Sequence, residues 1–197
     1  MRLWMTIPRL LKEIENRKSE IIQLTSELIK IPTVNPPGKN YREICEYLSK
    51  RLKKSGFYVN ILRAKGALAD SDKYPRYNLI ARHEGTYSGP CIHFNSHIDV
   101  VNAGKGWTRD PFGGAIEGDK IFGRGSCDMK GGLASSIVAA ETFIAIFPNY
   151  YGAIEISATA DEETGGYGGV AWLAENGHFS PKKVQHVIIP EPLNKDR

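Results

Sequence analysis

The chain has 197 residues, 41% of them hydrophobic, and a formal net charge of +4 at pH 7. This length and composition predict a globular chain with one sizeable core, and they exclude a low-complexity or fibrous protein. Basic residues alternate with glutamate in predicted helices, as in Lys12-Glu13, so the excess charge indicates a solvated face and not a nucleic-acid groove.

Cysteine usage and hydropathy exclude further classes. Cys45, Cys91 and Cys127 form no C-x-x-C motif, which argues against a disulfide framework and against a thiolate zinc site. The N-terminal segment has no uninterrupted apolar stretch, and the most apolar later stretch, residues 133–147, contains serine, threonine and glutamate. We therefore expect no secretory signal, no membrane partner, and a reducing, cytoplasmic location.

The first half of the chain predicts two helices followed by two strands. Apolar residues recur at helical spacing over residues 8–31 and again over 41–55, and the turn residues of PTVNPPGKN separate the two segments. Residues 57–62 and 77–82 have the composition of strands, with an irregular polar loop between them.

The second half alternates strands with helices. Residues 91–96, 153–159 and 184–189 predict strands, whereas residues 128–147 predict a largely apolar helix and 167–176 a short one. This alternation indicates an α/β fold in which a mixed β-sheet is sandwiched between helices.

Acidic residues and one histidine follow three of these strands. His97, the cluster Asp161-Glu162-Glu163, and Glu191 each come just after a predicted strand, and Asp128 begins the apolar helix. Ligands of open α/β sheets bind beyond the carboxyl ends of the strands. The acidic cluster alone is typical of a solvated turn, but three strands that deliver such groups to one edge predict a metal site.

The spacing within these groups assigns separate roles. His97 and Asp99 lie two residues apart, so in extended chain they share a face, and a carboxylate beside a ligating imidazole fixes its tautomer. Consecutive residues point in different directions, so Glu163 could bind a metal while Glu162 acts as general base toward a water.

Other chemistries fit the motifs less well. The segment Gly123-Arg-Gly-Ser-Cys-Asp128 starts like a dinucleotide-binding loop but lacks its third glycine, and Lys130 is not followed by serine or threonine, so neither phosphate loop is supported. Cys127 with His97 could form a nucleophile and base, although a cysteine beside a glycine turn is more often inert.

The second half of the chain resembles the two-zinc amidohydrolases and exopeptidases that include acetylornithine deacetylase, succinyl-diaminopimelate desuccinylase, aminoacylase and glutamate carboxypeptidase. The motifs occur in the order and approximate spacing of that family, with weaker similarity in NPPG (35–38) and YNLIAR (77–82). They are SHIDVV (96–101), WTRDPF (107–112), GDKIFGRGSCDMKGG (118–132), DEETGG (161–166) and PEP (190–192).

The resemblance implies a zinc-exopeptidase-like catalytic domain with two Zn²⁺ ions per complete site, or Co²⁺ or Mn²⁺ in their place. It implies that His97 and Glu191 bind one ion, that Asp128 bridges to a second, and that Glu163 binds that second ion. Asp99 would orient His97, Glu162 would be the base, and the Asp128–Met129 peptide would be cis. The family's late histidine has no counterpart, because His178 and His186 occupy other contexts.

The expected activity is metal-dependent hydrolysis of an amide bond in an N-acyl amino acid, with a dipeptidase or carboxypeptidase, or a non-catalytic half of a split enzyme, as alternatives. Residues 1–197 then correspond to the N-terminal part of the family's catalytic domain, without the lid and dimerisation domain or the C-terminal catalytic part, and the full-length family member would be a homodimer. Ligand counting predicts at most one tightly bound ion and little turnover by this chain alone, and exposed apolar surface predicts self-association.

Overall fold

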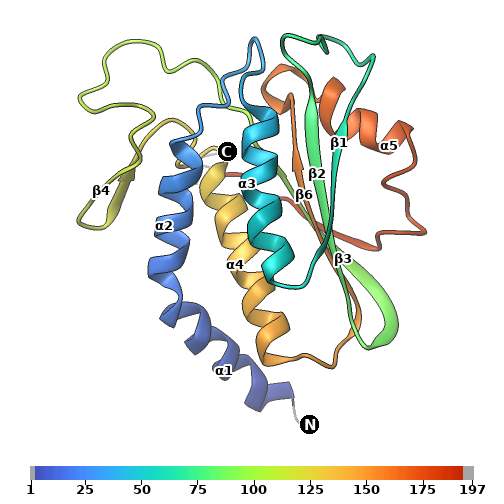
Figure 1. The fold of residues 1–197 in the computed structure, drawn as a ribbon. Helices are drawn as coiled ribbons and strands as arrows, with labels where there is room; N and C mark the ends of the chain where they lie inside the picture. The colour runs from blue at the N-terminus through green and yellow to red at the C-terminus, as the bar shows by residue number, and fades with distance from the viewer. Residues whose placement is uncertain (1–2, 193–197) are drawn as a thin grey trace.

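The computed structural model describes residues 3–192, with side chains from Ile7 onward. Its centre is a five-stranded sheet, with several helices stacked against one face (Figure 1). The strands lie in the order β1 (Tyr58–Arg63), β2 (Tyr77–Glu84), β6 (Tyr151–Thr159), β3 (Tyr87–His97) and β7 (His186–Ile188).

The direction of the strands decides where their polar ends meet. β1 pairs with β2, and β2 with β6, in antiparallel fashion, whereas β3 runs parallel to both β6 and β7. The carboxyl ends of β3, β6 and β7 therefore lie at one edge of the sheet, as the sequence predicts. The mixed α/β fold is confirmed.

Four helices form the main layer on one side of the sheet, and shorter helical turns that follow β6 lie at the ends of the strands and on the other side (Figure 1). The first group comprises α1 (Leu3–Asn16), α2 (Lys18–Ile29), α3 (Tyr41–Lys54) and α4 (Lys130–Ile146). The second comprises η1 (Glu162–Thr164), η2 (Tyr167–Ala171) and α5 (Trp172–Glu175). No helix among residues 3–192 is both long and apolar enough to cross a bilayer.

The core lies between the sheet and the helices α3 and α4. Leu48 and Leu52 of α3 and Ile137 of α4 are fully buried against Leu79 of β2 and Ile156 of β6. Burying one such side chain contributes about 1.5–3 kcal/mol to the free energy of folding. This packing holds α3 and α4 against the sheet.

The prediction of one helix over residues 8–31 is wrong. The helical segment begins at Leu3 and divides at Arg17, whose φ of −96° and ψ of 11° leave the α-helical region. The Arg17 guanidinium donates to Thr142 (2.8 Å) and to Glu141 (3.0 Å) of α4. We attribute the break to these contacts, which periodicity within the segment does not reveal.

A second difference is the two-stranded hairpin of β4 (Ala115–Glu117) and β5 (Lys120–Phe122), which the sequence did not predict. Its strands are three residues long, too short for an alternating pattern, and Gly118 makes the turn with a φ of +59°. A glycine accepts that left-handed conformation without a steric penalty.

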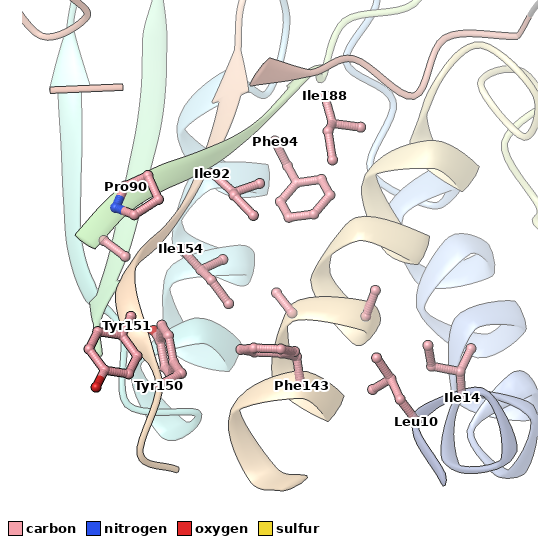
Figure 2. Close-up of a pocket in the computed structure, with 13 residues that line it drawn as sticks. Leu10, Ile14, Pro90, Ile92, Phe94, Phe143, Tyr150, Tyr151, Ile154 and Ile188 are labelled. Carbon is pink, nitrogen blue, oxygen red and sulfur yellow. The ribbon is translucent and has the colours of Figure 1, made fainter. Parts of the chain in front are cut away.

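An apolar cavity of about 270 Å³ lies between α1, α4 and the sheet. Figure 2 shows Ile92, Phe94 and Ile188 on the sheet side and Phe143 and Leu10 on the helix side. Among the described residues, its lining includes no carboxylate and no histidine. The group of His97, Asp128 and Glu191 lies elsewhere, at the carboxyl ends of the strands.

Candidate metal centre

His97 is the last residue of β3 and is almost completely buried, with a side chain 1% exposed. Its Nδ1 lies 3.0 Å from the main-chain oxygen of Asp99. A carbonyl only accepts, so Nδ1 carries a proton and Nε2 is the nitrogen that offers a lone pair once the ring is neutral. The fold therefore presents Nε2 toward the sheet edge in the tautomer that a metal needs.

Asp128 comes from the glycine-rich turn that precedes α4. Its Oδ1 lies 2.9 Å from His97 Nε2, and its carboxylate is 56% exposed. The Asp128–Met129 peptide is cis, as the resemblance implies. The buried Met129 side chain meets the main chain of His97, with Sδ 3.2 Å from its nitrogen, which holds the turn against the end of β3.

Glu191 follows β7 and reaches the same place, with Oε1 3.6 Å from His97 Nε2. A glycine in α4 permits this approach, because a Cβ at Gly132 would lie 2.4 Å from the carbonyl oxygen of Pro190. Ligand atoms of His97, Asp128 and Glu191 all lie within 4.8 Å of one another. Three of the four predicted metal ligands therefore form one compact group.

The turn after β6 brings the other two glutamates near this group. Glu162 is 55% exposed, and its Oε2 lies 3.8 Å from His97 Nε2. Glu163 is not part of the compact group among the described residues. It is nevertheless close enough for the charge of Asp128 to affect it. The two neighbouring glutamates thus face different surroundings, in keeping with their different predicted roles.

Asp99 lies beneath the site and is completely buried. Its Oδ1 is 3.6 Å from His97 Nδ1, so the hydrogen bond that fixes the ring goes to the Asp99 main chain and not to its carboxylate. The carboxylate instead accepts the backbone N–H groups of Glu162 and Glu163, each at 3.2 Å. Asp99 therefore connects the histidine to the turn that carries both glutamates.

The electrostatics of the group favour a bound cation. Burial and the charge of Asp128 raise the pKa of Glu163, and burial with the same neighbouring charge raises the pKa of Glu191 despite the opposing influence of His97. Burial opposes a charged imidazole, but the neighbouring carboxylates of Asp99, Glu191 and Asp128 raise the pKa of His97 to about 9. A divalent ion would relieve this repulsion, and imidazole with carboxylates is a donor set suited to Zn²⁺.

The remaining candidates of the sequence lie outside the group. His178 stacks on Trp172, with ring centroids 5.8 Å apart, and His186 is exposed within β7. Neither belongs to the cluster of ligands found among residues 3–192. Cys127 is exposed and belongs to no such cluster either, so the structure offers no support for a thiol nucleophile.

A match to a protein-family model identifies the family of this chain. Residues 93–197 match the model of peptidase family M20/M25/M40. This chain belongs to that family. The matched segment contains every residue of the compact group and the turn that carries Glu162 and Glu163.

Individual relatives agree with this assignment. The chain is 36% identical over 176 residues to a succinyl-diaminopimelate desuccinylase of Acinetobacter baumannii, and 32% identical over 179 residues to that of Buchnera aphidicola. These alignments cover 88% and 90% of the chain but only 43% and 44% of the relatives. The fold is similar to human carnosine dipeptidase 1, with a TM-score of 0.76 at 19% identity, over 95% of this chain and 41% of that one.

Sequence reasoning missed a layer of buried polar residues beneath the site. Asn35 lies among the residues predicted as a turn and Arg76 at the end of the irregular polar loop, and both are almost completely buried. Lys130 is buried as well and donates from Nζ to the main-chain oxygens of Leu28 (2.9 Å) and Ile31 (2.7 Å). For Asn35 and Arg76, a charged or amide side chain within a loop was the indication in the sequence.

Proposed function

We propose that this chain carries the metal-binding part of a hydrolase that cleaves an amide bond in a small N-acyl amino acid. The observation that carries the proposal is the group of His97, Asp128 and Glu191 within 4.8 Å, with the Glu162 carboxylate beside it. Membership in family M20/M25/M40 and the identity to desuccinylases support it.

Each residue has a role that its geometry permits. His97, Asp128 and Glu191 would hold one ion, and Asp128 with Glu163 would supply part of a second site. A metal ion bound there lowers the pKa of a water molecule and polarises the substrate carbonyl. Glu162, which is exposed at the edge of the group, would accept a proton from water and return it to the departing amine.

Zinc is the ion we propose, with Co²⁺ and Mn²⁺ as substitutes. One imidazole and two carboxylates make three protein ligands, which is the number found in catalytic zinc sites that keep a position open. The second site has only two carboxylates among the described residues, so we expect one tightly bound ion in this chain.

The desuccinylase relatives favour an acylated amino acid as the substrate. The similarity to carnosine dipeptidase 1 makes dipeptide hydrolysis the second candidate. Because the chain spans less than half of these relatives, homodimer formation and a cytoplasmic location remain part of the proposal. The three cysteines are free in the described part of the chain, which suits a reducing compartment.

The test combines metal binding with turnover. Calorimetric titration with Zn²⁺ should give one strong site, and Glu162→Gln should retain it while abolishing any hydrolysis of succinylated or acetylated amino acids. A chain that binds no Zn²⁺, or whose turnover survives both a chelator and Glu162→Gln, would contradict the proposal.

A control experiment distinguishes a self-sufficient enzyme from one half of a split enzyme. Hydrolysis by this chain alone, lost on chelation, would show a self-sufficient enzyme. Hydrolysis that appears only after a second polypeptide with further ligands is added would favour one half of a split site.

A further inference from the structure

A buried polar network lies under the turn that carries Glu162 and Glu163, and it is built by segments far apart in sequence. Asp161, at the start of the turn, is 2% exposed and accepts from Arg76 Nε (3.0 Å) and from the Tyr41 hydroxyl (3.1 Å). Arg76 also donates to the main-chain oxygen of Pro37 at 2.7 Å. The network thus ties the turn to the loop that contains Pro37.

That loop delivers Asn35 to the centre of the network. The backbone N–H of Asn35 donates to the Val100 oxygen (2.9 Å), and the backbone N–H of Val100 donates to the Thr33 oxygen (3.1 Å). These two hydrogen bonds hold the loop against the segment after β3. The Asn35 side chain, in a residue only 1% exposed, consequently lies next to Asp99.

The amide nitrogen of Asn35 lies among three acceptors. Nδ2 is 2.9 Å from Asp99 Oδ2, 2.9 Å from Thr164 Oγ1 and 3.3 Å from Asp161 Oδ1. The opposite orientation of the amide would place its oxygen against two carboxylates, so the donor assignment is chemically required. Asn35 is therefore a neutral donor shared between two buried carboxylates.

The contacts continue from Asn35 to both glutamates. Asp99, which accepts from Asn35, also accepts the backbone N–H groups of Glu162 and Glu163. Thr164, which lies at the other end of η1, contacts Asn35 directly. One side chain thus fixes the turn from both ends.

We propose that Asn35 is a positioning residue that holds the turn of Glu162 and Glu163 in place through Asp99 and Thr164. The inference rests on the proposed function for the use of these glutamates, whereas the hydrogen-bonded chain itself does not depend on a metal. Neither leucine nor aspartate can replace the amide: leucine has no donor, and aspartate would add a third carboxylate beside Asp99 and Asp161.

Two measurements on the full chain test the proposal. Amide hydrogen exchange without metal should become about tenfold faster at Glu162 and Glu163 in Asn35→Leu, because the hydrogen bond between Asn35 and Asp99 is charge-assisted. Zn²⁺ affinity by calorimetry should fall about 10-fold or more, as when other partners of metal ligands are removed. Asn35→Asp, which preserves shape, should act in the same direction.

A core variant and a double variant provide the controls. Val138→Ala loosens the fully buried core of α4 without touching the turn, so it should leave both readouts unchanged. Because Asn35 acts through Asp99 as well as through Thr164, the effect of Asn35→Leu/Asp99→Asn on exchange at Glu162 and Glu163 should be smaller than the sum of the effects of the two single variants.

The outcomes distinguish the two proposals. Wild-type exchange and Zn²⁺ affinity in both Asn35 variants, additive effects in the double variant, or equal effects of Val138→Ala would overturn the positioning role. A wild-type chain without Zn²⁺ binding would instead overturn the proposed function, and the exchange rates would still decide the role of Asn35.

Discussion

Two groups of charged residues in this molecule differ in the balance of their charges. The cluster between the helices contains two arginines, Arg17 and Arg51, and two glutamates, Glu20 and Glu141. The candidate metal centre instead gathers several carboxylates around one histidine at the carboxyl ends of the strands. The first group balances its charges, whereas the second leaves negative charge in excess.

The pKa values of the glutamates shift in opposite directions in the two groups. The hydrogen bond from Arg17, together with Arg51, lowers the pKa of Glu20 to about 2, although burial opposes the shift. Burial and neighbouring carboxylates raise the pKa values of Glu163 and Glu191. Arginine partners therefore favour the ionised glutamate in the balanced cluster, whereas burial and crowding disfavour it in the candidate metal centre, and functional sites often lower stability in this way.

Removing one charge from the balanced cluster should cause the largest loss of folding stability. Glu141 is 6% exposed at its side chain and accepts from Arg17 and Arg51 as well as from Ser55 (2.9 Å). Glu141→Gln should lower the free energy of unfolding by about 3 kcal/mol, because it leaves two arginines without their buried partner. Thermal and urea denaturation measure the change.

An exposed pair provides the control for this experiment. Arg42 and Glu46 lie 2.8 Å apart with side chains 68% and 48% exposed, so Glu46→Gln should change stability by less than about 0.5 kcal/mol. Zn²⁺ affinity should be unchanged in both variants. Equal stability of Glu141→Gln and the wild type would show that the cluster contributes nothing.

In the candidate metal centre, removal of one charge should weaken metal binding without lowering the stability of the metal-free chain. Asp128→Asn should reduce Zn²⁺ affinity by more than about 100-fold, beyond the loss seen when only a partner of a ligand is removed. Without metal, the same variant should unfold at an equal or higher temperature, because it removes one of the repelling charges. Calorimetry and thermal denaturation in a chelator test the two halves.

Asp119, on the exposed turn between β4 and β5, offers a matched control. Asp119→Asn makes the same chemical change away from the centre and should alter neither quantity. An Asp128→Asn chain with wild-type affinity, or one that is clearly less stable without metal, would contradict the contrast between the two groups.

Glu163 should show a smaller effect on the first ion. It lies outside the compact group of described ligands, so Glu163→Gln should change the affinity for the first Zn²⁺ by less than about tenfold. Any weak second binding event should disappear. Two strong sites in the wild type, or loss of the first in this variant, would show that Glu163 belongs to the first site.

The sequence predicted the grouping of His97, Asp128 and Glu191 better than it predicted the buried residues beneath them. Apolar runs that end in His97 or Glu191 mark the carboxyl ends of strands, and this local pattern is enough to place such residues at one edge. The break at Arg17 and the role of Asn35 depend on partners more than 60 residues away, at Glu141 and Asp99. Periodicity reports the faces of one element and carries no information about such contacts.

The smallest expected effect is the pH dependence of the balanced cluster. The pKa of Glu20 is about 2 in the folded chain, against 4.5 as its ordinary value, so its ionised form stabilises the folded state above about pH 4.5. This contribution should decline as the pH falls from 4.5 and disappear near pH 2. Because the Glu20 side chain is 37% exposed, solvent screening limits it to under about 1 kcal/mol. Urea denaturation from pH 6 to pH 2.5 should therefore give a slightly shallower decline for Glu20→Gln than for the wild type, and identical slopes would show that Glu20 is not stabilised by Arg17 and Arg51.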